Sequence, residues 1–153
     1  MSSGLFLFFL VLWTHPNSEK KIQIIQNKMA RFVLSKDSRD HIGQQELDII
    51  GTLNVSDRVK QLKMNHVFKI FNNTAPAYMH LNFKRLNEQH GFNTRGHSYN
   101  LFIPMLSSST RDSFYFTALQ EWNNLPSNIK SLTNLSVFKK EVKHFMSQRA
   151  KEV

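Results

Sequence analysis

Apolar residues recur at intervals of three and four positions along much of this chain, and this spacing constrains its fold most. One turn of an α-helix takes about 3.6 residues, so side chains at that spacing share one helix face. Five Gly and four Pro offer few sharp turns, which also favours helices over many short strands. The expected fold is mainly α. It has five to six helices, over about 18–34, 44–50, 57–72, Pro76 to Leu81, 111–123 and 134–149.

Residues that commonly cap helices stand near the expected ends. Gly51 is expected to end its helix in the left-handed conformation. Ser18 and Ser56 are expected to accept backbone N–H groups at helix starts, and so is Ser109 or Thr110 before the helix at 111–123.

The first and last helices each carry one apolar face. On the first, that face holds Ile22, Ile25, Met29 and Phe32. On the last, the residues expected to face inward are Phe138, Val142, Phe145 and Met146.

Residues 84–109 are the least regular stretch. They include Gly91, Gly96, Pro104 and three consecutive serines, and they allow one short strand pair involving Tyr99 to Ile103. The expected organisation is an apolar segment over 1–16, a helical part over 17–83, this irregular loop, and a second helical part over 110–153.

The apolar segment holds ten consecutive residues, Gly4 to Trp13, too few to span a bilayer, which needs about 20. It resembles the apolar part of a signal peptide, but no Lys or Arg precedes it. The alternative is a strand or helix from the core of a larger protein.

The chain is basic and contains no cysteine. Its net charge is +9, and the charge is uneven: six basic and two acidic residues lie in 19–39, four acids in 40–57, and four basic residues in 58–69. Such clustering suits nucleic acid or another anionic surface, although solvated helices also carry it. The lack of Cys excludes disulfides, cysteine nucleophiles and Cys-ligated zinc.

Several short motifs follow one another in order. Near the start stands Ile25-Gln26-Asn27-Lys28-Met29-Ala30-Arg31, and near the end Trp122-Asn123-Asn124-Leu125-Pro126 precedes Phe138-Lys139. Between them come Arg58, Phe68-Lys69, Pro76-Ala77-Tyr78-Met79, Thr94-Arg95, Pro104 and Phe114. This ordered set resembles the C-terminal tail of a reverse transcriptase from a non-LTR (LINE-type) retrotransposon.

The resemblance implies an incomplete piece of a larger protein, downstream of the catalytic polymerase part. Such polymerases hold two metal ions with an Asp pair in an Ala-Asp-Asp turn and a third Asp. This chain has no Asp-Asp and no Ala-Asp dipeptide. We therefore expect no enzyme activity, no catalytic residue and no cofactor. A structural role is implied for the family-motif residues Gln26, Asn27, Arg31, Pro76, Tyr78, Arg95, Pro104, Phe114, Trp122, Asn123, Leu125, Pro126 and Phe138.

Three residue types remain open to more than one interpretation. Trp122 could stack on a nucleobase, but its place on a Phe-rich helical stripe favours the core. Asn123 is expected to cap the helix end or the turn before Pro126. The seven His are scattered, with no pair at the four-residue helical spacing of a metal site, so no metal is expected.

Basic residues are the best candidates for a binding role. Those on helix faces that could touch phosphates are Lys20, Lys21, Lys28, Arg31, Lys60, Lys63, Lys139, Lys140 and Lys143. The expected function is a non-catalytic reverse-transcriptase remnant with weak, non-specific RNA or DNA binding, without a small-molecule substrate, inside the cell. The first alternative is a protein-interaction module that packs on a polymerase body. The second is a small secreted or membrane-anchored protein, with N-x-S/T sequons at Asn54, Asn72 and Asn134.

Overall fold

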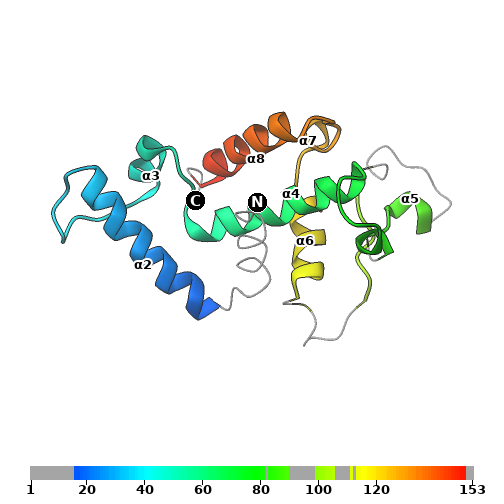
Figure 1. Cartoon of the computed structure of the whole chain (residues 1–153), viewed down its shortest axis with the longest axis horizontal. Helices are drawn as coiled ribbons and strands as arrows, with labels where there is room; N and C mark the ends of the chain where they lie inside the picture. Colours follow the sequence, from blue (N-terminus) through cyan, green and yellow to red (C-terminus); the bar gives the residue numbers. More distant parts are fainter. Residues whose placement is uncertain (1–15, 82, 90–98, 106–110, 112, 151–153) are drawn as a thin grey trace. The chain divides into compact units, whose positions relative to one another are not determined.

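The computed structural model describes residues 16–81, 83–89, 99–105, 111 and 113–150, and in these ranges the protein is mainly α-helical, as predicted (Figure 1). Its elements are α2 (Pro16–Val33), α3 (Gln44–Ile50), α4 (Val55–Phe71), the 3₁₀ helix η1 (Ala77–Leu81), α5 (Leu86–Gln89), α6 (Phe114–Asn123), α7 (Ser127–Lys130) and α8 (Leu135–Arg149). No strand occurs in the described ranges, where the expected strand pair reduces to an antiparallel bridge between Arg85 and Leu101.

The predicted helices are confirmed to within three residues at each end, including the helical turn that forms η1. The short helices α5 and α7 were not predicted, because four residues are too few to show a helical repeat. The predicted segment 1–16 lies outside the described residues except for Pro16, and Arg95 lies outside them as well.

Helix ends follow capping chemistry, but not always at the predicted residue. Gly51 has φ 75°, which confirms the left-handed end of α3. The prediction for Ser56 was wrong: α4 starts earlier, and Asn54 Oδ1 accepts the N–H of Asp57 at 2.8 Å. Ser18 lies inside the first turn of α2, so it is not a cap. Ser113 caps α6 in place of Ser109 or Thr110, which lie outside the described residues.

Contacts divide the chain into two compact units: unit 1 comprises residues 1–61 and 143–153, and unit 2 comprises residues 62–142. The units cut across the expected segments, because the end of α8 belongs with α2 and α3. Lys143 Nζ donates to the Gly51 carbonyl at 2.6 Å, and Ser147 Oγ donates to Asp48 Oδ1 at 2.7 Å. These bonds attach the last turns of α8 to the end of α3.

Unit 1 has a small core, and α2 contributes little apolar surface to it. Ala30 of α2 packs with Ile42 and Leu47, and all three are buried. Two glutamines of α2 bond to the link between α3 and α4: Gln26 Nε2 donates to the Leu53 carbonyl, and Gln23 Oε1 accepts from Val55 N, both at 2.8 Å. The inward side of α2 is therefore largely polar.

Unit 2 is built on stacked aromatic rings. Phe138 of α8 is fully buried, and its ring centroid lies 4.2 Å from that of Phe68 and 5.9 Å from that of Trp122. Such ring pairs stabilise a core beyond the burial of their area. The predicted core position of Trp122 is confirmed, because its side chain is 4% exposed.

Candidate functional site

The Trp-Asn-Asn-Leu-Pro string anchors an extended segment of unit 2. The Asn123 amide pairs with the backbone of Leu101 on both sides: Oδ1 accepts the Leu101 N–H at 2.8 Å, and Nδ2 donates to the Leu101 carbonyl at 2.9 Å. Trp122 Nε1 donates to the Tyr99 carbonyl at 2.8 Å. The expectation that Asn123 caps the helix end or the following turn was wrong, because the partner lies 22 residues earlier.

Lys130 of α7 reinforces the same place, and sequence reasoning missed it. Its side chain is 7% exposed, and Nζ donates to Asn100 Oδ1 at 2.8 Å and to the Asn123 carbonyl at 2.9 Å. The carbonyl belongs to the end of α6, where a cation is favoured by the helix dipole. Burial lowers the pKa of the Lys130 ammonium. No sequence signal separates this lysine from those on exposed faces.

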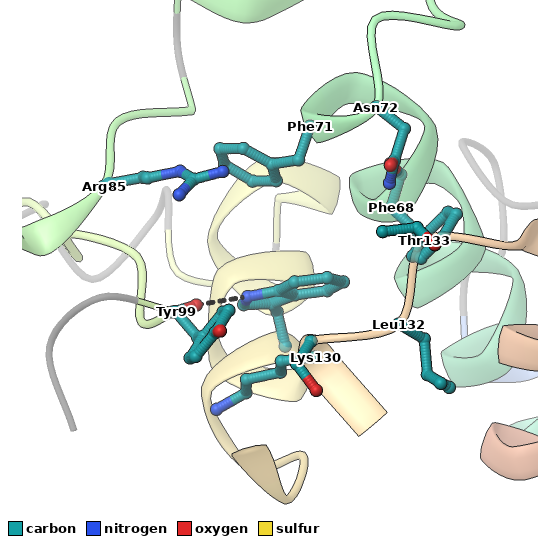
Figure 2. A pocket seen from close by; sticks show the side chains of 10 residues that line it. Phe68, Phe71, Asn72, Arg85, Tyr99, Lys130, Leu132 and Thr133 are labelled. Atoms are coloured by element: carbon teal, nitrogen blue, oxygen red, sulfur yellow. Dashed lines mark hydrogen bonds between the residues drawn. The ribbon is translucent and has the colours of Figure 1, made fainter. Parts of the chain in front are cut away.

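A cavity of about 170 Å³ lies beside these anchors in unit 2 (Figure 2). Its aromatic and cationic lining residues are Phe68, Phe71, Tyr99, Trp122, Arg85 and Lys130. The Arg85 guanidinium carbon lies 5.2 Å from the centroid of the Phe71 ring, within the range of a cation–π contact. Asn72, Ser131 and Thr133 add an amide and two hydroxyls, so the lining is aromatic, positive and partly polar.

The predicted phosphate-binding residues divide between the units. Lys20, Lys21 and Lys28 are exposed together on α2 in unit 1, and Lys139 and Lys140 are exposed on α8 in unit 2.

The other four make contacts within the chain. Arg31 Nε donates to the Asp40 carbonyl, Lys60 pairs with Asp57 at 3.1 Å, and Lys63 Nζ donates to Thr117 Oγ1. Lys143 is bonded to Gly51, as described above. Four of the nine predicted phosphate-binding residues therefore already have an acceptor within the chain.

Helix α2 presents an apolar face that the described residues of unit 1 leave uncovered. Met29 is 65% exposed and Phe32 is 88% exposed, and the other exposed apolar residues of this helix are Ile24, Ile25 and Val33. A contiguous exposed apolar patch commonly marks a binding surface. The amphipathic pattern of α2 is confirmed, but the helix contacts the unit through Ala30 and two glutamines, and the predicted apolar face is largely exposed.

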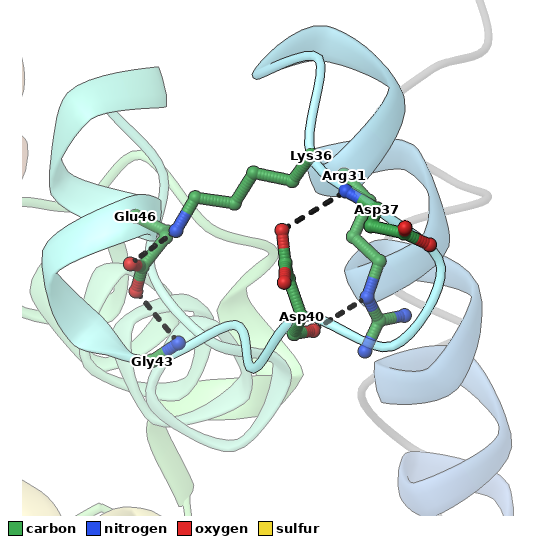
Figure 3. A network of polar contacts seen from close by, with 6 residues as sticks. All are labelled: Arg31, Lys36, Asp37, Asp40, Gly43 and Glu46. Carbon is green, nitrogen blue, oxygen red and sulfur yellow. Dashed lines mark hydrogen bonds and ion pairs between the residues drawn. The ribbon is translucent and has the colours of Figure 1, made fainter.

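A polar network links the end of α2 to the start of α3 (Figure 3). Lys36 Nζ lies 2.7 Å from Glu46 Oε1, and Gly43 N donates to Glu46 Oε2 at 2.8 Å. The hydrogen bond from Lys36, followed by that from Gly43, lowers the pKa of Glu46 from 4.5 to about 2. The network fixes the loop between the two helices.

The remaining family-motif residues have mixed positions. Leu125 is buried, and the Pro126 carbonyl accepts the N–H groups of Ile129 and Lys130 at the start of α7. The Phe114 ring meets His66 edge to face at 5.5 Å. Asn27 Oδ1 accepts from Gln23, the Pro76 carbonyl accepts from Met79 N, Pro104 is half-buried, and Tyr78 is exposed.

The sequon asparagines take part in helix ends. Asn54 caps α4, and Asn134 Oδ1 accepts the N–H groups of Ser136 and Val137 at the start of α8. Asn72 Nδ2 donates to the Phe68 carbonyl at the end of α4. All three asparagines therefore have side-chain hydrogen bonds at helix ends.

Across the part of the chain that the structure describes, no group of three His, Asp or Glu side chains could hold a metal ion. No helix of the described residues is both long and apolar enough to cross a membrane. No protein-family model matches the chain, and neither the curated proteins nor the solved structures include a significant match.

Proposed function

We propose that this chain is a non-catalytic module that binds a protein partner through the exposed apolar face of α2. The observation that carries the proposal is the orientation of that helix: Gln23 and Gln26 bond inward, while Met29 and Phe32 lie in solvent. These exposed side chains leave apolar area in water. Burying one Phe or Met side chain against a partner would stabilise the complex by about 1.5–3 kcal/mol.

The surroundings of this face indicate the chemistry of the partner. At 100° per residue, Ile25, Met29 and Phe32 share an arc of about 60°, and Lys21 and Lys28 lie next to it. A suitable partner therefore offers an apolar groove with acidic residues at its rim. The resemblance to non-LTR reverse transcriptases makes the polymerase body of such an enzyme our choice of partner, and on the same ground we propose that the protein acts inside the cell.

The test is a calorimetric titration of the chain with the polymerase part of a non-LTR reverse transcriptase. The double variant Ile25→Ser/Phe32→Ser should weaken binding at least about tenfold, because central apolar anchors dominate interface energy. Ile49→Ser is the matched control, since Ile49 is an exposed isoleucine on α3 of the same unit. Equal effects of the two changes would refute the proposal. Adsorption to anionic vesicles without protein binding would refute it in favour of a membrane surface.

A second candidate is weak nucleic-acid binding through the exposed lysines. Its specific support is that Lys20, Lys21 and Lys28 are all exposed on α2, and no ion pair joins them to another described residue. Phosphate contacts of this kind bind without sequence preference and weaken steeply with salt.

The salt dependence of binding to a single-stranded 12-mer tests this second candidate. Replacing all three lysines by Gln should reduce the slope of log K against log salt by about 2, at roughly 0.7 per phosphate contact on a single strand. A flat salt dependence, or no binding at low salt, would exclude it.

A further inference from the structure

We propose that the cavity of unit 2 binds one unpaired pyrimidine base of a single-stranded nucleic acid. This inference rests on the nucleic-acid candidate above and adds a site to it. It is independent of protein binding through α2, because every lining residue of the cavity lies in unit 2.

The size of the cavity selects the ligand. Its volume of about 170 Å³ is close to the ~150 Å³ of an apolar cavity that holds one benzene ring. Pockets for drug-sized molecules occupy about 300–1,000 Å³. The cavity is therefore of the size that holds one six-membered ring.

The lining suits a base better than an aromatic side chain of a protein. Phe71 and Tyr99, which are partly exposed, supply aromatic surface, and such surfaces bind bases of single strands by stacking (Figure 2). Trp122 also lines the cavity, but its side chain is only 4% exposed. Asn72 and Thr133 are exposed at the cavity and offer an amide oxygen and a hydroxyl. A pyrimidine edge can hydrogen-bond to these groups. A phenyl ring would displace the water bound to them and could not replace its hydrogen bonds.

The charge around the cavity selects a polyanion. Arg85 and Lys130 are both in the lining, and no lining residue that the structure describes is acidic. Unit 2 as a whole holds nine Lys and Arg against four Asp and Glu. Arg85, which lies over the Phe71 ring, brings a guanidinium to the cavity, and this cation would attract the phosphate beside a bound base.

The indole of Trp122 gives a direct readout. The chain has two Trp, so the variant Trp13→Phe leaves Trp122 as the single fluorophore. Two 12-mers are compared at low salt: oligothymidylate and an abasic strand with the same phosphates. We expect oligothymidylate to quench Trp122 and to bind at least about fivefold more tightly than the abasic strand, from the stacking of one base.

Tyr99→Ala should remove at least half of that preference, because it deletes a lining ring that is 41% exposed while its carbonyl still accepts from Trp122. Tyr78→Ala is the control, since Tyr78 is 66% exposed and is not among the lining residues. Equal binding of the two strands, or an unchanged preference in Tyr99→Ala, overturns the base site but leaves the second candidate standing. Failure of both strands to bind overturns both. Quenching by a phenylalanine peptide and not by oligothymidylate overturns the site in favour of a protein ligand.

Discussion

Replacing Asn123 by Ala should destabilise unit 2 far more than its place at the end of α6 suggests. In the bridge with Arg85, the N–H and the carbonyl of Leu101 point away from that neighbour. Asn123 Oδ1 accepts from the N–H, and Asn123 Nδ2 donates to the carbonyl. Leu101 is 2% exposed, so water reaches these groups only after the amide is removed. Asn123 thus makes the two backbone hydrogen bonds to Leu101 that a neighbouring strand would otherwise make.

The magnitude follows from the two backbone groups that the variant leaves unpaired. Each buried group without a partner costs about 1–3 kcal/mol. Entry of a water into the space of the amide would recover part of this. We therefore expect a loss of about 2–3 kcal/mol, or a fall of roughly 1–2 M in the urea midpoint. The probe is Trp122 fluorescence, because this ring lies in the same unit.

The control is Asn124→Ala at the next residue, which is exposed and should change stability by about 0.5 kcal/mol at most. Hydrogen exchange of the Leu101 amide gives a second, local measure: it should be slow in the native protein and fast in Asn123→Ala. Equal midpoints for the two variants, together with unchanged protection of Leu101, would refute the reasoning.

Three further substitutions test other parts of the structure. Glu46→Gln should lower the stability of the protein at pH 6, because only the ionised carboxylate of Glu46 pairs with Lys36. The difference in stability from the native protein should shrink as pH falls from 4.5 to about 2, the range over which the folded protein takes up the proton of Glu46. Urea midpoints across this range measure the difference, and a constant difference would contradict the assignment. Phe138→Ala should cost about 3–5 kcal/mol in urea unfolding, as a fully buried ring is lost, whereas Val137→Ala on the exposed side of α8 should change little. Asn54→Ala should cost about 1 kcal/mol through the loss of the cap on α4, and circular dichroism during thermal unfolding would show it; an unchanged melting temperature would exclude the capping role.

The helices could be predicted from the sequence because their signals are local. An apolar repeat of 3.6 residues and a glycine directly after it can both be recognised within one short segment, as for the helix that Gly51 ends. Periodicity reports that a helix has an apolar face, but not whether the chain covers that face. On α2 the predicted face exists, and Met29 and Phe32 nonetheless stay exposed.

The candidate site depends on contacts between distant residues, which no local pattern reveals. Asn123 meets Leu101 across 22 positions, and Lys130 meets Asn100 across 30. The same limit applies to the basic residues. Lys143 has the sequence context of a solvated lysine, yet it donates to a carbonyl 92 positions away. Charge shows where cations are available, and only tertiary structure shows which of them already have an acceptor.

The contacts between the end of α8 and the end of α3 can form only after the long stretch of chain between them has been synthesised. Lys143 and Ser147 reach partners 92 and 99 positions earlier in the chain. At about 5–20 residues per second, a ribosome adds that stretch in roughly 5–20 s. During this interval all of residues 62–142 emerge, so unit 2 can fold while the first part of unit 1 still waits for its last helix. The apolar residues of α2 are therefore synthesised well before the last turns of α8, which belong to the same unit.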